Sequence, residues 1–186
     1  QEQEERIDRE LEALRAIIGE YIYSDSDDTL ENAIGALLKA SGRTLSAAES
    51  CTGGEISHLI TTVAGSSSYY LGSVTSYAIP AKEKVLGVPH ETIEKYGVVS
   101  AEVAAAMAAG VRKLTGSDYA VATTGLPGGG DGVHPDGTVF VGVADSKGSV
   151  HTKMFQYSND RKRNIERFAA SALHFLLTII KSELNH

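Results

Sequence analysis

Apolar positions along the chain repeat with two periods, one typical of helices and one typical of buried strands. Helical spacing is clear after Asp28 and Thr29, either of which can cap a helix that Gly42 ends. Ser100 is a typical N-cap for the Ala-rich segment that follows it. In all, the pattern predicts helices over 1–19, 28–42, 80–87, 90–96, 101–114 and 160–184, and one that begins directly after the 49–54 turn.

Five further segments have the length and composition of strands, and they alternate with the helices. The segment 138–144 shows no alternation, which predicts burial on both faces, whereas the more polar 149–157 fits a sheet edge. Leu71, Val74 and Tyr77 are the expected buried anchors of the strand predicted over 69–77. The strands are predicted over 44–48, 69–77, 119–124, 138–144 and 149–157. This order predicts an α/β fold, a three-layer α/β/α sandwich with a mostly parallel or mixed sheet of about five strands.

The first 28 residues differ from the rest and predict a linker. Gln1–Gly19 reads as an acidic amphipathic helix, and Tyr21–Asp28 reads as a short extended piece with an acidic turn. The three Asp of that turn fit helix capping better than calcium, since the Gly and closing Glu of a calcium loop are missing. The chain begins with Gln rather than Met, which leaves room for a further domain before residue 1, and we expect a linker over 1–28 followed by a domain over 29–186.

Composition excludes several function classes. The 186 residues carry a formal charge of -7, so a chain-wide basic footprint for duplex nucleic acid is absent. A single cysteine excludes an internal disulfide framework and a multi-Cys metal site, and it favours a reducing compartment. The apolar run 169–180 is interrupted by polar residues and too short to span a membrane, and the N-terminus does not resemble a secretory signal. The 19 glycines exceed average usage and predict special backbone positions.

The strongest candidate for chemistry is Ser50, at a tight turn between a strand and the next helix. Backbone N–H groups at a helix start have no partner within the helix. Those of Cys51, Thr52 and Gly53 are therefore expected to be available to an oxyanion or a phosphate. Ser50 is placed as a nucleophile beside its own oxyanion hole, although an N-cap serine explains the same spacing.

A serine nucleophile needs a base, and the chain offers six histidines and one well-placed lysine. The histidines form no HxH or HExxH pattern, so no metal site is predicted, and His58 faces away from Ser50 on a regular helix. Lys82 follows a mainly apolar strand and Pro80. Partial burial at the sheet edge would lower its pKa and let it act as a base. A solvated lysine at a helix start is the alternative.

Two further features point to an anionic ligand. The glycine cluster 125–132 follows a strand and can wrap an anion with backbone donors, although it matches neither GxGxxG nor GxxxxGK[ST]. The alternative is a mobile glycine-rich loop. Arg161, Lys162, Arg163 and Arg167 open the last helix, and Arg161 fits a phosphate contact best because it lies at the helix start. A solvated basic face is the alternative.

Eight short motifs together resemble one family, over about Thr29 to the C-terminus. They are Ala48-Glu49-Ser50-Cys51-Thr52-Gly53-Gly54, Ala64-Gly65-Ser66-Ser67, Val74-Thr75-Ser76-Tyr77 with Lys82 five residues on, Leu86-Gly87-Val88, Gly97-Val98-Val99-Ser100, Thr124-Gly125, Gly137-Thr138-Val139 and Asp160-Arg161. With these motifs the chain resembles the C-terminal domain of the CinA (competence/damage-inducible) proteins. Stand-alone relatives of that domain are nicotinamide mononucleotide deamidases of the PncC type.

The resemblance implies a cytoplasmic amidohydrolase of pyridine nucleotide salvage. It would convert nicotinamide mononucleotide and water into nicotinate mononucleotide and ammonia without metal or cofactor. Ser50 matches the family's nucleophile, Lys82 its general base, and Tyr77 the tyrosine that orients the base or relays a proton. The expected substrate contacts are Cys51, Thr52, Gly53, Gly54, Thr124, Gly125 and Arg161. The resemblance also implies a homodimer and an N-terminal domain in the full-length protein, with no nucleic-acid or membrane partner.

The chain departs from the family pattern in expected substrate-contact regions. The family's Ile-Ala-Gly-Pro is here Leu126-Pro127-Gly128-Gly129, its Lys-Pro-Val-Gly is His134-Pro135-Asp136-Gly137, and its Gly before Asp-Arg is Asn159. Asp136 is expected to weaken phosphate binding by repulsion. These departures keep two alternatives open: a non-catalytic nucleotide-binding or interaction domain, and hydrolysis of a different small amide.

Overall fold

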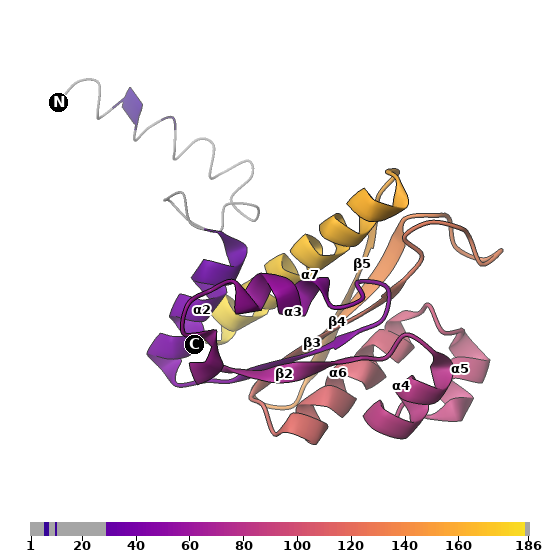
Figure 1. The fold of residues 1–186 in the computed structure, drawn as a ribbon, viewed down its shortest axis with the longest axis horizontal. Coiled ribbons are helices and arrows are strands. Elements are labelled where there is room, and N and C mark those ends of the chain that lie inside the picture. The colour runs from indigo at the N-terminus through magenta and orange to yellow at the C-terminus, as the bar shows by residue number, and fades with distance from the viewer. Residues whose placement is uncertain (1–5, 8–9, 11–28, 185–186) are drawn as a thin grey trace.

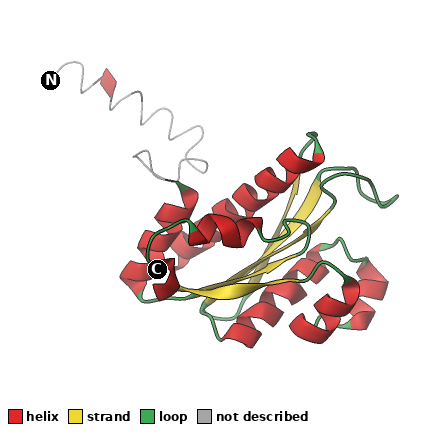
Figure 2. Ribbon diagram, in the orientation of Figure 1, coloured by secondary structure: helices red, strands yellow, loops and turns green. Residues whose placement is uncertain are grey.

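A mixed five-stranded sheet lies between two layers of helices (Figures 1 and 2). The computed structural model describes residues 6, 7, 10 and 29–184. In chain order the elements are α2 (Leu30–Ser41), β1 (Leu45–Glu49), α3 (Glu55–Thr61), the short 3-10 helix η2 (Ser66–Ser68), β2 (Tyr70–Thr75), α4 (Ile79–Leu86), α5 (His90–Tyr96), α6 (Ala101–Thr115), β3 (Tyr119–Gly125), β4 (Thr138–Ala144), β5 (Val150–Gln156) and α7 (Arg161–Leu184). Helices α2, α3 and α7 cover one face, and α4, α5 and α6 cover the other. The predicted three-layer sandwich is confirmed.

The strand order is β2-β1-β3-β4-β5, in which the first three strands are parallel and the last two are antiparallel to their neighbours. The carboxyl ends of β1, β2 and β3 therefore meet at one edge of the sheet. The first residues of β4 and the last residues of β5 lie at the same edge. In α/β sheets, ligands bind at such carboxyl-end edges, so the topology points to this edge as the place for a site.

Side-chain caps and left-handed glycines set the helix ends as the sequence predicts. The Thr29 hydroxyl accepts a hydrogen bond from the Asn32 N–H at 3.4 Å, and the Ser100 hydroxyl accepts one from the Val103 N–H at 3.3 Å. Gly42 ends α2 with φ 65°, in the left-handed region that favours glycine. These contacts confirm both predicted caps and the predicted helix stop.

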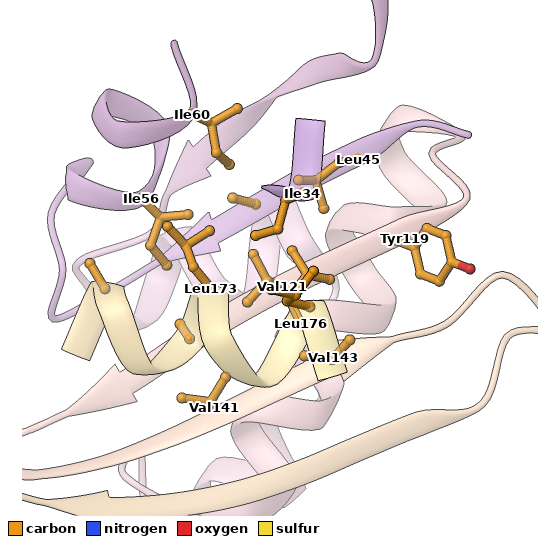
Figure 3. Packing of buried hydrophobic residues seen from close by; sticks show 14 of the residues in the cluster. Ile34, Leu45, Ile56, Ile60, Tyr119, Val121, Val141, Val143, Leu173 and Leu176 are labelled. Carbon is orange, nitrogen blue, oxygen red and sulfur yellow. The ribbon is translucent and has the colours of Figure 1, made fainter. Parts of the chain in front are cut away.

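Each face of the sheet carries its own apolar cluster (Figure 3 shows one of them). In β4 the side chains of Val139, Val141 and Val143 belong to the cluster under α7, and Ala144 belongs to the cluster under α6. The predicted burial of this strand on both faces is therefore confirmed. Full burial of a valine side chain contributes about 1.5–3 kcal/mol, so these two clusters hold the layers together.

Small residues let α6 lie directly on the sheet. A Cβ added at Gly142 would sit 2.4 Å from the Ala104 carbonyl oxygen. We therefore expect Gly142→Ala to lower the free energy of unfolding by about 1–3 kcal/mol, because the helix must shift away from β4. Urea denaturation would show a lower midpoint at an unchanged m-value. An unchanged midpoint would contradict this close packing.

Strand bounds differ slightly from the predicted ones, and two of the three predicted anchors of β2 are wrong. Leu71 is 48% exposed and Tyr77 is 64% exposed, and only Val74 packs against an apolar cluster. The reason is that β2 is an edge strand, paired only with β1, so the helical layers cover it incompletely.

Few positions in the predicted linker 1–28 are described. Arg6, Ile7 and Glu10 are helical, which agrees with the helix predicted over 1–19. The remainder of that helix and the acidic turn of 21–28 lie outside the described residues. Within the part of the chain that the structure describes, no helix is long and apolar enough to cross a membrane.

Candidate active site

Ser50 directly follows β1, at the edge where the parallel strands end, and it opens into a cavity of about 290 Å³. The wall of this cavity comes from segments far apart in the sequence. It is lined by Ser50, Cys51, Tyr77, Lys82, Val98, Val99, Thr124, Gly125, Leu126, Pro127, Gly128 and Arg161. Seven of these are among the predicted catalytic or binding residues, namely Ser50, Cys51, Tyr77, Lys82, Thr124, Gly125 and Arg161.

Ser50 and Lys82 are in direct contact. The Lys82 Nζ lies 2.9 Å from the Ser50 Oγ, and the lysine side chain is only 1% exposed. Lys82 comes from α4, whose first turn holds Pro80, a residue with a backbone φ suited to a helix start. Burial lowers the pKa of Lys82 below its usual range, because desolvation disfavours the charged ammonium. The predicted burial is confirmed, and the solvated alternative is wrong.

Two main-chain carbonyls set the direction of the lysine amine. Its Nζ lies 2.6 Å from the Ser76 carbonyl oxygen and 3.3 Å from that of Tyr77. A neutral amine has two N–H donors and one lone pair. When both donors point at the carbonyls, the lone pair is left for the Ser50 hydroxyl proton. This arrangement suits a general base.

The turn after Ser50 differs from the predicted one. Helix α3 begins only at Glu55, with Gly54 at its N-cap, so the N-cap alternative for Ser50 is wrong. The Gly53 N–H donates to the Ser50 carbonyl at 3.2 Å, so it is not free, contrary to the prediction. The reason is that Gly53 and Gly54 take positive φ values of 63° and 111° and form a closed turn before the helix.

Two peptide N–H groups remain for an oxyanion. Between residues 29 and 184, no other residue accepts a hydrogen bond from the N–H groups of Cys51 and Thr52, and the Cys51 N–H interacts only with its own thiol. They follow the Ser50 Oγ directly in the chain. Thr52, Gly53 and Gly54 are not among the residues that line the cavity, so Cys51 is the one predicted binding residue of this turn in the cavity wall that the structure describes.

Cys51 is a second potential nucleophile in the cavity wall, but its thiol is held in the neutral form. Burial raises the pKa of the Cys51 thiol to about 12. The thiolate is the reactive form of cysteine, so at neutral pH this side chain stays unreactive. Of the two side chains, Ser50 has a base beside it, so it is the better candidate nucleophile of the cavity.

Tyr77 contacts Lys82 through its carbonyl and not through its phenol. The Tyr77 hydroxyl instead accepts a hydrogen bond from Arg161 Nη2 at 3.1 Å. Among the described residues, no hydrogen bond joins this hydroxyl to Ser50 or Lys82. Arg161 also donates to the Gly128 carbonyl at 3.2 Å. A guanidinium has five N–H donors, so three remain for a ligand at the cavity mouth.

The glycine-rich loop forms the opposite wall only in part. Thr124 is fixed by its hydroxyl, which donates to the Val98 carbonyl at 2.8 Å. Of the residues that depart from the family pattern, Leu126 and Pro127 line the cavity. His134, Asp136 and Asn159 lie outside its lining.

The outlying departures belong to the loop's own structure. The side chain of Asn164 in α7 donates to the carbonyls of Pro127 and Asn159, both at 2.9 Å. His134 packs edge-on against Phe140 and bonds Asp131 at 3.1 Å. These contacts hold the loop against α7 and β4.

Histidines and metal ligands do not gather at the site. His58 is exposed, and none of the histidines in the described part of the chain lines the cavity. Within that part, no group of three or more His, Cys, Asp or Glu could hold a metal ion.

Sequence reasoning missed three contributions to the site. Val98 and Val99 line the cavity from the loop before α6, and Glu49 is buried beside Ser50. For Glu49 a signal existed, because a charged residue at the end of an apolar strand must find partners when it is buried. For the valines no local pattern distinguishes cavity wall from core.

The comparison with known protein families shows to which family the chain belongs. Residues 27–180 match the CinA C-terminal domain. The chain belongs to this family. The CinA domain of this chain therefore carries Ser50, Lys82 and the whole cavity wall within its matched part.

Relatives and solved structures of the CinA family agree with the observed fold. A CinA-like protein of Salinibacter ruber is 46% identical over 170 residues, and one of Chloroherpeton thalassium is 44% identical over 177 residues. The chain covers 41% and 42% of these proteins, so it spans less than half of their length, while 90% and 92% of the chain is covered.

Two solved structures have the same architecture. A competence-damaged protein (CinA) superfamily protein from Klebsiella pneumoniae has a TM-score of 0.79 at 28% identity, covering 82% of the chain and 96% of that protein. A competence/damage-inducible protein from Agrobacterium tumefaciens has a TM-score of 0.78 at 33% identity, covering 81% and 93%.

Proposed function

We propose that the CinA domain of this chain is an amidohydrolase that deamidates nicotinamide mononucleotide to nicotinate mononucleotide. One observation carries the proposal: a buried lysine amine, its pKa lowered, lies 2.9 Å from a serine hydroxyl that opens into a cavity. This pair is a nucleophile and its base. The choice of substrate comes from the family resemblance. We place the reaction in the cytoplasm, which the single, unpaired cysteine favours.

In the first half of the reaction, Ser50 is acylated. Its Oγ attacks the carboxamide carbon while its proton passes to the Lys82 Nζ. The N–H groups of Cys51 and Thr52 stabilise the oxyanion of the tetrahedral intermediate. The Lys82 ammonium then protonates the amide nitrogen, and the C–N bond breaks. Ammonia departs, and a nicotinoyl ester remains on the Ser50 Oγ.

In the second half, water clears the ester. Lys82, again neutral, takes a proton from the water as its oxygen attacks the ester carbon. The intermediate collapses, the Ser50 Oγ leaves and recovers its proton from Lys82, and nicotinate mononucleotide is released. Each half uses the same two residues in opposite acid–base roles.

The lining of the cavity suits a ligand with an apolar ring and an anionic end. Val98, Val99, Leu126 and Pro127 provide apolar surface, and Arg161 provides unused donors at the mouth. Pockets for small ligands combine apolar walls with a few placed polar groups. Pockets for small ligands usually have volumes of roughly 300–1,000 Å³. The cavity volume of about 290 Å³ lies at the lower limit of this range, which favours a mononucleotide over a larger ligand.

The test is ammonia release from nicotinamide mononucleotide by the purified chain, with identification of nicotinate mononucleotide by mass spectrometry. Tight binding of the nucleotide without ammonia at any pH would favour the rival, a non-catalytic nucleotide-binding or interaction domain. Ammonia from other small amides but not from this one would favour a different substrate. The lining positions Leu126 and Pro127 are the departures that could shift this choice.

Arg161 gives a prediction about substrate binding. We expect Arg161→Gln to raise the KM for nicotinamide mononucleotide about 10- to 100-fold with a small change in kcat, because one charge-assisted bond to phosphate is worth about 1.5–3 kcal/mol. Steady-state kinetics would measure this. Lys162→Gln is the matched control, since Lys162 is exposed and lies outside the cavity lining. Equal KM increases in both variants would contradict a direct phosphate contact.

A further inference from the structure

Glu49, the last residue of β1, carries a fully buried carboxylate beside Ser50. Its Oε2 accepts hydrogen bonds from the Thr52 hydroxyl at 2.7 Å and from the N–H groups of Gly54 and Ile56, both at 3.0 Å. Its Oε1 accepts from the N–H and the hydroxyl of Ser57, at 2.9 and 2.8 Å. Five donors therefore converge on one carboxylate.

The charge of this carboxylate is balanced by dipoles and not by a cation. From residue 29 to residue 184, no Lys or Arg side chain forms an ion pair with Glu49. A buried charge without such a set of donors would be strongly destabilising. Three of the five donors are peptide N–H groups, which cannot accept a hydrogen bond. An amide at this position would face at least one of them with its own NH₂ group.

These bonds shape the turn that carries the nucleophile. Glu49 binds the hydroxyl of Thr52 and the N–H of Gly54, on both sides of the left-handed Gly53. Because the Gly53 N–H donates to the Ser50 carbonyl, every N–H from Gly53 to Ser57 has an acceptor in another residue. In the described part of the chain, the N–H groups of Cys51 and Thr52 have none. The carboxylate thus fixes which two N–H groups stay open.

The same residue also ties the turn to the strand that orients Lys82. The Ser57 hydroxyl lies 2.8 Å from the Tyr70 hydroxyl and 2.6 Å from that of Ser73, both on β2. The main-chain carbonyl of Glu49 accepts from the Ser76 N–H at 2.8 Å. Ser76 provides a carbonyl that holds the lysine amine. Glu49 therefore lies between the two halves of the catalytic pair.

We propose that Glu49 is a positioning residue that holds the Cys51 and Thr52 N–H groups where an oxyanion on the Ser50-bound acyl carbon forms. It touches neither substrate nor reacting atoms and acts through the turn. The inference rests on the proposed amidohydrolase function. It requires an intact carboxylate, because the donors around it leave no place for an NH₂ group.

The experiment compares Glu49→Gln with Asp118→Asn in the full chain. Asp118 is the matched carboxylate, because it accepts hydrogen bonds from the Thr44 N–H, the Thr44 hydroxyl and Arg43. It directly precedes β3 and therefore lies at the opposite end of the parallel strands. We expect Glu49→Gln to lower kcat for ammonia release about 100-fold, since small misplacements of catalytic groups have effects of this size. KM and the pH profile of kcat/KM, which reports Lys82, should stay unchanged, as should kcat in Asp118→Asn.

A second readout works without the proposed substrate. An alkyl fluorophosphonate phosphonylates activated serines: the Ser50 Oγ–P bond forms, the P–F bond breaks, fluoride leaves, and the serine proton passes to Lys82. Its phosphoryl oxygen needs the same N–H donors. If the wild type is labelled but releases no ammonia, the proposed substrate is wrong, and the labelling rates still test the Glu49 inference. Labelling of Glu49→Gln as fast as of Asp118→Asn would overturn the inference.

A weaker variant covers the case in which Glu49→Gln fails to fold. Ser57→Ala removes one donor hydroxyl and keeps the carboxylate. We expect a fall of about threefold to tenfold in kcat and in labelling rate, with KM unchanged. Thr61→Ala is the control, because the Thr61 hydroxyl is also on α3 but bonds only helix carbonyls. If Ser57→Ala folds and both variants have wild-type rates, the result counts against the inference. Labelling that does not depend on Ser50 would overturn it outright.

Discussion

Replacing Ser50 with alanine is expected to lower kcat for ammonia release about 10,000-fold or more. The substitution removes the atom that forms the acyl bond, and loss of a nucleophile in serine hydrolases has effects of this order. The fold should be retained, because the Ser50 N–H still donates to the Thr123 carbonyl at 3.1 Å, and only one side-chain bond, to Lys82, is lost. Steady-state kinetics with a coupled ammonia assay would measure the effect.

The matched control for this substitution is Ser67→Ala. Ser67 is an exposed residue in the short helix before β2 and lies outside the cavity lining, so its rate should equal that of wild type. Calorimetry should show similar melting temperatures for both variants and the wild type. Equal ammonia release by Ser50→Ala and wild type would refute the assignment of the nucleophile, whatever the substrate.

Replacing Lys82 with methionine is expected to lower kcat/KM about 1,000-fold and to remove its pH dependence. General-base catalysis contributes about 100- to 10,000-fold. The active form of Lys82 is the neutral amine. Burial lowers its pKa, so in the wild type kcat/KM should rise about tenfold per pH unit below that lowered pKa and level off above it. The plateau should begin below 10.5, the ordinary value for lysine.

Lys84→Met controls for loss of a positive charge on the same helix, because Lys84 is exposed and does not line the cavity. It should keep the wild-type profile. A wild-type profile that stays flat from neutral to alkaline pH, with chemistry rate-limiting, would speak against Lys82 as the base. So would a profile that Lys82→Met leaves intact.

Local patterns were sufficient to predict the elements of the fold and the identity of the central pair. Thr29 and Ser100 reveal helix starts because capping depends on a few adjacent residues. Ser50 and Lys82 emerged as candidates from their places next to strand ends. Their actual contact depends on β1 and β2 lying side by side, which no local pattern states.

The errors arose where long-range contacts decide the outcome. The turn after Ser50 was expected to be a plain helix start, but the buried Glu49 carboxylate and two left-handed glycines delay α3 to Glu55. The resemblance implies that Tyr77 orients Lys82 or relays a proton. Its carbonyl contacts the Lys82 amine, whereas its phenol bonds Arg161, which is distant in sequence and belongs to α7.

That late arrival has a consequence for the newly made chain. A ribosome releases the nucleophile turn before α7, and α7 covers one face of β3 and β4 and brings Arg161 to the cavity. Domains fold as units during or after synthesis. The growing polypeptide therefore holds its serine and lysine long before the pocket around them is closed. The proposed activity should appear only when α7 docks, and a chain that stops before Arg161 would lose that activity together with much of its core.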